Sequence, residues 1–161
     1  MTPIIQIEHL AAGYDGKQVL NDINLTVYQD DYLGIIGPNG GGKTTLMRLI
    51  LGLMKPTDGS IKYFKDGKEV KEISMGYLPQ YNSLDKQFPI SVYEVVLSGL
   101  SRSKSLFSRY TQAHHQQVLD TLERMQLTEY KDRHIAALSG GQLQRVLLAR
   151  AIVSRPDVVI L

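Results

Sequence analysis

Residues 37–44, with the sequence GPNGGGKT, constrain the fold of this chain more than any other segment. Glycines allow successive backbone N–H groups to turn inward and form a nest for an anion. A helix that follows such a nest points its positive end at the same place. In this pattern the lysine, here Lys43, contacts the β- and γ-phosphates, and the hydroxyl of Thr44 binds Mg²⁺. We therefore predict a phosphate-binding loop. The alternative, a glycine-rich turn without a ligand, seldom shows this full spacing.

The residues on both sides of this loop fit the prediction. The apolar run YLGII at residues 32–36 predicts a strand that leads into the loop. After the loop, apolar side chains recur at helical spacing and predict one buried helix face, formed by Leu46, Leu49, Ile50 and Leu53. A strand before and a helix after are the context that a phosphate-binding loop requires.

Strands and helices are also predicted along the rest of the chain. Residues 4–10 and 23–28 predict two strands separated by an Asp-Gly turn, KPTDGSIKYF predicts a turn and a strand, and KEISMGYLPQ predicts a strand that ends at Pro79 and Gln80. Ser91 and Glu94 predict a capping box at a helix start. A helix over 111–126 is predicted from the spacing of Leu119, Leu122, Met125 and Gln126. A helix over 140–154 and a final strand in DVVIL complete the prediction.

A second motif begins the last predicted helix with Leu138, Ser139, Gly140, Gly141 and Gln142. Ser139 is predicted to cap this helix and Gln142 to complete a capping box. A helix start with two glycines is also a candidate anion site. The residues alone leave both interpretations open: a well-capped core helix or a second phosphate contact.

Composition excludes several classes of function. The net charge of +2 is too small to indicate nucleic acid or an anionic membrane as a partner. The chain has no cysteine, which excludes a disulfide framework and thiolate chemistry. No apolar run approaches the ~18 residues of a membrane span, so any membrane role is expected to come through a partner. The four histidines, His9, His114, His115 and His134, lack metal-ligand spacing.

The phosphate loop, the Pro79-Gln80 pair and the LSGGQ motif, in this order, resemble the ATP-binding cassette (ABC) ATPases. The resemblance covers the chain from Tyr14 to Leu161. It implies an α/β fold: a P-loop NTPase (RecA-like) core with an N-terminal antiparallel β subdomain and an α-helical signature subdomain, with the C-terminal part of the core missing. Within this partial domain of residues 1–161, it places the core and β subdomain at 1–87 and 136–161 and the helical subdomain at about 88–135.

The resemblance implies ATP and Mg²⁺ as ligands and assigns roles by position. Tyr14 matches the aromatic residue that stacks on adenine. Gln80 matches the glutamine that reaches Mg²⁺ and the attacking water, so Gln80 and Lys43 are the expected catalytic residues. Thr44 and Gln80 are the expected Mg²⁺ ligands. The implied nucleotide-binding set also contains Gly37, Pro38, Asn39, Gly40, Gly41, Gly42, Lys43, Thr44 and Thr45 of the loop, and Ser139, Gly140, Gly141 and Gln142 of the signature.

The same resemblance implies partners and a location. In the family, the signature of one subunit binds the γ-phosphate held by another, so a head-to-tail dimer with a second copy is expected. Further expected partners are a transmembrane permease and, indirectly, a substrate-binding protein, with no nucleic acid. The intact protein is expected to hydrolyse ATP to drive transport, in the cytoplasm and peripheral on the inner face of the cell membrane through the permease.

Residues 81–99, YNSLDKQFPISVYEVVLSG, resemble the ATPases of importers for zinc, manganese or iron. The matching positions are Asp85, Phe88, Pro89, Val95, Val96, Leu97 and Gly99. Phe88 is either an exposed aromatic anchor for a partner helix or a core residue before the capped helix. Two other positions depart from the family pattern. Asp30 replaces a usual Gly, in a turn that Asp tolerates, and Gly41 replaces a usual Ala or Ser.

The resemblance extends to the last residues, PDVVIL. In the family, this apolar strand is followed by an Asp that holds Mg²⁺ through water and then by a catalytic Glu. Both would come directly after Leu161, so we expect the intact protein to continue and this chain alone to bind ATP poorly without hydrolysing it. Asp157 cannot substitute, because it lies at the other end of the strand, about 13 Å away at ~3.3 Å per residue.

Other functions remain open at this stage. These are a soluble ABC-type ATPase that acts on the ribosome or nucleic acid, an ABC transporter for another substrate, and a nucleotide-binding module without catalysis. The stretch between the phosphate loop and the signature has no sustained heptads. This disfavours the DNA-repair and chromosome types, which insert long coiled coils there.

Overall fold

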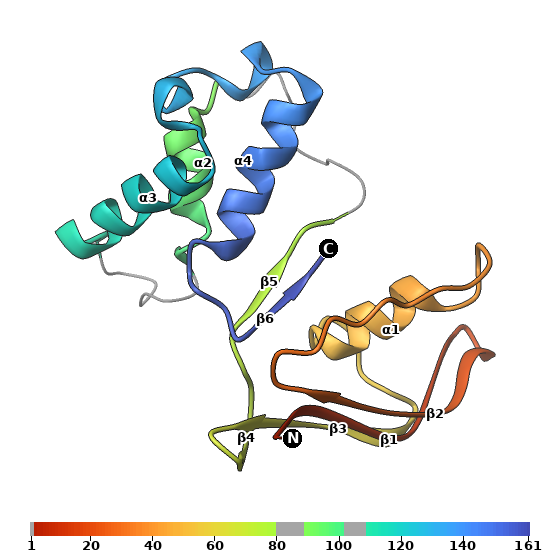
Figure 1. Cartoon of the computed structure of the whole chain (residues 1–161). Coiled ribbons are helices and arrows are strands. Elements are labelled where there is room, and N and C mark those ends of the chain that lie inside the picture. Colours follow the sequence, from red (N-terminus) through yellow and green to blue (C-terminus); the bar gives the residue numbers. More distant parts are fainter. Residues whose placement is uncertain (1, 80–88, 102–108) are drawn as a thin grey trace. The chain divides into compact units, whose positions relative to one another are not determined.

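The computed structural model describes residues 2–79, 89–101 and 109–161, which form two compact units, Met1–Ile73 and Ser74–Leu161 (Figure 1). The elements of the first unit are β1 (Pro3–Tyr14), β2 (Lys17–Tyr28), α1 (Lys43–Ile50), β3 (Asp58–Lys65) and β4 (Lys68–Val70). Those of the second are β5 (Met75–Tyr77), α2 (Val92–Ser98), α3 (Gln112–Arg124), the 3₁₀ turns η2 (Thr128–Tyr130) and η3 (Ile135–Ala137), α4 (Gly140–Ile152) and β6 (Val158–Ile160). None of the helices in these residues has the length and apolar character that a membrane crossing needs.

The first unit is an antiparallel sheet with one helix on its face. The strand order is β2-β1-β3-β4, and α1 lies over the sheet (Figure 1). The hydroxyl of Tyr63 on β3 donates to the carbonyl oxygen of Ile50 at 2.8 Å and so ties the end of α1 to the sheet. The core between sheet and helix contains Ile5, Ile7, Leu10, Leu20, Leu46, Leu49 and Ile50. The two predicted N-terminal strands are confirmed, and the predicted turn between them has positive φ at Asp15 and Gly16.

The predicted strand at residues 32–36 is wrong for this structure. The segment has no regular secondary structure, and the Tyr32 side chain is 99% exposed. A strand exists only as a hydrogen-bonded partner of another strand, and the four-stranded sheet of this unit does not include these residues. The apolar run therefore indicated a segment that could form a strand, but it did not determine which strand would pair with it. Asp30, just before it, has φ 65°, which confirms that Asp accepts the turn there.

The predicted apolar face of α1 is correct for Leu46, Leu49 and Ile50 and wrong for Leu53. The helix ends at Ile50, and Gly52 at φ 68° reverses the chain. The backbone N–H of Leu53 then donates to the carbonyl of Arg48 at 2.8 Å, a typical helix-ending bond. This turn directs Leu53 outward, where 62% of it is exposed.

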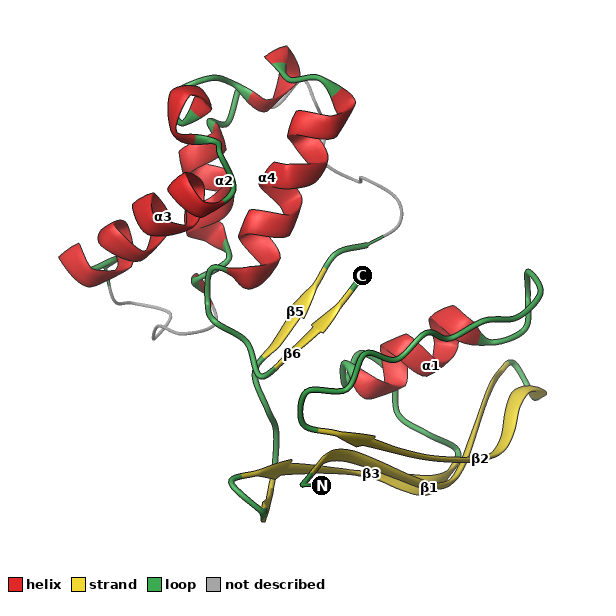
Figure 2. Cartoon of the chain, in the orientation of Figure 1, coloured by secondary structure: helices red, strands yellow, loops and turns green. Residues whose placement is uncertain are grey.

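The second unit packs three helices beside a short parallel pair of strands. β5 and β6 pair in parallel, and α4 packs on β5 and on α2 (Figure 2). The capping boxes predicted at Ser91 and Ser139 are both present. The helical core contains Val92, Val95, Val96, Leu100, Val118, Leu122, Leu127, Ile135, Leu143, Val146, Leu147, Ala149 and Val153. The division at Ile73 does not test the predicted subdomain limits, which stay a prediction.

Of the apolar residues at the predicted helical spacing in α3, Leu122 is buried and Met125 packs against the core, but Leu119 does not. Val118 is fully buried beside Leu122, whereas Leu119 is 39% exposed. The helix ends at Arg124, and Gln126 has φ 54° and is exposed, so this residue does not belong to the buried face. Leu and Val differ little in apolar character, so the spacing alone did not decide which of the two neighbours faces α4.

The burial of Val118 and the exposure of Leu119 give a stability prediction in which the neighbouring residue serves as the control. Val118→Ala should lower the free energy of unfolding by about 2 kcal/mol, because it leaves a cavity in a fully buried site. Leu119→Ala should cost less than about 1 kcal/mol, although it removes more atoms. Urea denaturation followed by circular dichroism measures both values. A larger loss of unfolding free energy in Leu119→Ala than in Val118→Ala would show that Leu119, and not Val118, faces the core.

Candidate functional site

The loop at residues 37–42 is a glycine turn that the first unit requires for steric reasons. The backbone N–H of Gly41 donates to the carbonyl oxygen of Pro38 at 3.1 Å, and Gly40 and Gly42 have φ of 81° and 83°. A Cβ at Gly42 would lie 2.6 Å from Cδ2 of Leu20. A Cβ at Gly41 would lie 3.0 Å from the Pro38 oxygen, so the Ala or Ser usual in the resembling family would press on this turn.

Lys43 places its positive charge inside this loop. Its Nζ donates to the carbonyl oxygens of Gly37 and Pro38, both at 2.7 Å. These two bonds fold the side chain back over the turn and hold the ammonium group at the loop that the sequence analysis assigned to phosphate.

The N-terminus of α1 differs from those of α2, α3 and α4. The latter three begin with capping boxes, in which side chains bond to the first backbone N–H groups. The cap of α1 is Gly42, which offers no side chain, and the first turn of α1 has no acidic residue. Its first N–H groups and its positive end therefore remain available to an external anion. Together with Lys43, they make an arrangement suited to phosphate.

The two threonines that follow Lys43 have different environments. Thr44 is exposed in the first turn of α1, so its hydroxyl is accessible to a ligand or a metal ion. Thr45 is only 7% exposed. In the described residues, no three His, Cys, Asp or Glu side chains gather to hold a metal. A threonine hydroxyl is an oxygen donor of the kind that Mg²⁺ accepts. The other predicted ligand, Gln80, lies outside the described residues.

Tyr14 ends β1 at the tip of the hairpin, with 43% of its surface exposed. Arg48 of α1 donates from Nη1 to the Tyr14 hydroxyl at 3.4 Å. Hydrogen bonding to Thr45, and next to Arg48, lowers the pKa of the Tyr14 phenol. Arg48 was not among the residues predicted from the sequence. Its position three residues after Thr45, on the same side of the helix, could have indicated it.

The signature motif is confirmed as a helix start. Ser139 Oγ accepts from the backbone N–H of Gln142 at 3.3 Å, and the Gln142 side-chain oxygen accepts from the Ser139 N–H at 2.8 Å. Gly140 and Gly141 are exposed, and a Cβ at either would meet nothing within 4 Å. Packing therefore gives no reason for two glycines here. Their exposure is compatible with a close approach by a ligand, and this second anion contact stays a prediction.

Asp157 has a structural role. Its carboxylate accepts from the backbone N–H of Ser74 at 2.9 Å, and its own N–H donates to the Ser74 carbonyl at 2.8 Å. These bonds join the starts of β5 and β6 at the end opposite to Leu161.

Gly76 on β5 packs so closely on α4 that a Cβ would lie 2.2 Å from the Ala151 oxygen.

The segment that resembles metal importers is partly explained by packing. Val95 and Val96 are buried in the helical core, and a Cβ at Gly99 would lie 2.2 Å from the Arg150 oxygen. These residues fit α2 to α4. Asp85 and Phe88 lie outside the described residues, so both interpretations of Phe88 stay open.

His114 and His115 take part in local contacts of α3. His114 completes the capping box with Thr111, and His115 Nδ1 is hydrogen-bonded to the Tyr93 hydroxyl, with the two rings stacked. His9 Nδ1 contacts Asp22 at 2.7 Å on the exposed side of the sheet.

Comparison with known proteins gives consistent results. The model of the ABC transporter family matches residues 20–161. The chain is 40% identical over 164 residues to the zinc uptake system ATP-binding protein ZurA of Listeria monocytogenes, covering 100% of this chain and 64% of ZurA. It is 40% identical over 155 residues to the manganese transport system ATP-binding protein MntB of Bacillus subtilis, covering 96% of this chain and 62% of MntB.

The fold is also found in solved structures. The chain resembles cbiO1 of Clostridium perfringens, part of the ABC transporter complex cbiONQ, with a TM-score of 0.78 and 28% identity over 99% of this chain and 64% of cbiO1. The predicted α/β fold class is thereby confirmed. The chain spans less than two thirds of the length of ZurA, MntB and cbiO1.

Proposed function

Because the chain belongs to the ABC transporter family, we propose that the whole protein is the ATP-binding and ATP-hydrolysing subunit of a membrane transporter. The observation that carries this proposal is the start of α1. Its N-terminus has no side-chain cap, it follows a glycine turn, and the Lys43 ammonium is held over that turn by two carbonyl oxygens. These are the features that bind the phosphates of a nucleotide.

The residues of this loop and its neighbours have separate roles in the proposed binding of ATP. The turn of Gly37 to Gly42 brings backbone N–H groups to the phosphates, and Lys43 stabilises the charge that develops on the γ-phosphate. The Thr44 hydroxyl, and Gln80 outside the described residues, would hold Mg²⁺, which would neutralise charge on the phosphate oxygens when bound. Tyr14 offers an exposed aromatic face for the base.

We further propose that the transported substrate is a metal ion: zinc, manganese or iron. Support comes from the names of the relatives ZurA and MntB and from the importer-like segment at 81–99. In the described residues, no cluster of side chains could select a metal ion. We propose that ion selectivity resides in other subunits and that this chain supplies the energy.

The proposed assembly follows from the same family membership. A second copy binds head to tail, so that Ser139, Gly140, Gly141 and Gln142 of one copy reach the nucleotide held by the other. A transmembrane permease binds the pair on the inner face of the cell membrane, and a substrate-binding protein acts through the permease. The exposed glycines of the signature support the contact with a second copy, because they leave open space for it.

Uptake measurements test the transport proposal. Deletion of the gene should reduce cellular uptake of radioactive zinc, manganese or iron to background, and the intact gene should restore it. Uptake of an unrelated substrate, such as an amino acid, serves as the control. Unchanged uptake of all three metals would reject the metal assignment, while the ATP-binding assignment is tested separately by the Lys43 substitution described in the Discussion.

A further inference from the structure

Tyr14 contacts two elements of the first unit, although its side chain is half exposed. Its backbone belongs to the hairpin tip, where Tyr14 pairs with Lys17. Its hydroxyl contacts Thr45 and Arg48 of α1. The ring is therefore held between a strand and a helix, while 43% of the residue stays exposed.

The hairpin end of this attachment is rigid. A Cβ at Gly13 would lie 2.2 Å from the Lys17 carbonyl oxygen, so the two strands approach each other closely just before Tyr14. Asp15 and Gly16 both have positive φ, as a tight two-residue hairpin turn requires. The backbone of Tyr14 therefore has little freedom to move the ring.

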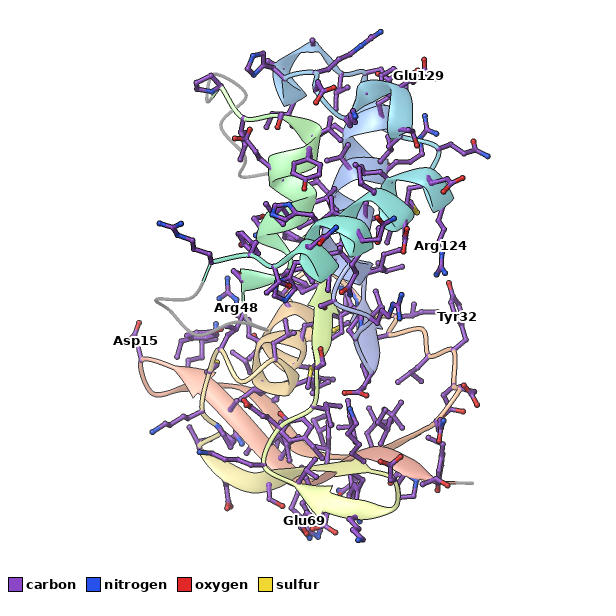
Figure 3. The ribbon with its side chains drawn as sticks, turned by 90° about the vertical axis from the view of Figure 1, so that its left-hand side faces the viewer. Asp15, Tyr32, Arg48, Glu69, Arg124 and Glu129 are labelled. Carbon is purple, nitrogen blue, oxygen red and sulfur yellow. The ribbon has the colours of Figure 1, made fainter. Side chains whose placement is uncertain are left out.

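The helix end of the attachment comes from the helix that carries the phosphate loop. Thr45 and Arg48 lie one and two turns after Gly42, on α1, and Arg48 is exposed on the side of the hairpin tip (Figure 3). Figure 3 labels Arg48 and Asp15, the residue after Tyr14, on the same side of this unit. A ligand that binds both the phosphate loop and the Tyr14 ring therefore contacts two sites that are both connected to α1.

We propose that Arg48 is a positioning residue that fixes the Tyr14 ring in the orientation that stacks on the base of a nucleotide. This inference rests on the proposed function. A ring that is fixed before binding loses less rotational freedom when a flat ligand stacks on it, so binding is tighter. The attachment also limits the distance between the Tyr14 ring, at the end of β1, and the phosphate loop, because Arg48 belongs to the helix that follows this loop.

The inference predicts a loss that depends on the base. Arg48→Met should weaken ATP and ADP binding by the whole protein about three- to tenfold, the scale of one hydrogen bond. Binding of inorganic triphosphate, which has no base, should not change. Arg48→Lys, which keeps a charged donor, should retain most of the affinity for ATP. Lys68→Ala, an exposed cation on β4, is the matched control. Isothermal titration calorimetry without Mg²⁺ measures all these affinities.

Two further measurements separate positioning from a general structural effect. Tyr14→Phe should weaken ATP binding as much as Arg48→Met, and the double variant should lose no more than either single variant. The ultraviolet titration of the Tyr14 phenol, taken as the difference from Tyr14→Phe, should show a higher pKa in Arg48→Met, because a hydrogen bond that lowers it is lost.

The outcomes distinguish this inference from the proposed function. If Tyr14→Ala leaves ATP binding unchanged, base stacking on Tyr14 is wrong and the inference falls with it. If Tyr14→Ala weakens binding about tenfold, as stacking predicts, but Arg48→Met has no effect, only the positioning role is wrong. An equal loss for ATP and inorganic triphosphate in Arg48→Met would assign Arg48 a charge effect on phosphate and overturn the inference.

Discussion

Lys43→Ala is expected to reduce ATP hydrolysis by the whole protein at least about a hundredfold, the usual cost of removing a charge that stabilises the reacting group. The Lys43 ammonium lies against the carbonyls of Gly37 and Pro38, at 2.7 Å from each, so it is already placed in the loop before a ligand arrives. A colorimetric assay of released phosphate, with ATP and Mg²⁺ in excess, measures the loss.

A matched lysine controls for the change in net charge. Lys62 lies on β3, where its Nζ forms an ion pair with Glu8 at 2.7 Å, outside the phosphate loop. Lys62→Ala should leave the turnover within about twofold, because partly exposed pairs contribute little. Equal losses for the two variants, or ordinary turnover in Lys43→Ala, would contradict the assignment of the loop.

Gly99→Ala is expected to lower the free energy of unfolding by about 3 kcal/mol, at the upper end of overpacking costs. The added Cβ would lie 2.2 Å from the Arg150 carbonyl oxygen and 2.6 Å from Cγ1 of Val153, both contributed by α4 or its C-cap. A backbone carbonyl within a helix cannot move aside as a flexible side chain can. The change therefore forces α2 away from α4 and opens the helical core.

The control for this prediction is a glycine on α4 itself. Gly141→Ala should leave the free energy of unfolding unchanged or slightly higher, because its Cβ would meet nothing within 4 Å and alanine favours helix. Urea denaturation of both variants measures the difference. Equal stabilities of Gly99→Ala and Gly141→Ala would show that the close approach of α2 and α4 does not exist.

Sequence reasoning was most successful where local chemistry alone decides the conformation. The capping boxes at Ser91 and Ser139 were predicted because a side-chain oxygen and an acceptor three residues later satisfy the first backbone N–H groups without help from the rest of the fold. The turn at Asp15 and Gly16 was predicted for a similar reason. Such features depend on neighbours within a few residues.

Prediction from the sequence was least successful where a contact with a distant segment determines the local structure. Residues 32–36 are apolar, yet no strand forms there, because pairing needs a partner that the run cannot specify. Val118 rather than Leu119 faces the core, because helices α2 and α4 fix the rotation of α3. The spacing predicted the helix, but it did not show that Val118, rather than Leu119, is buried.

The sequence by itself determined the loop of residues 37–44, the signature motif and the family to which the chain belongs, because these depend on residue types at fixed spacing. Only the tertiary structure showed that Gly42 is required by Leu20, that Gly99 is required by Arg150, and that Arg48 reaches the Tyr14 hydroxyl. The physical reason is the same in all three cases. Each contact joins atoms far apart in the chain, and only the packing of strands and helices brings them within reach.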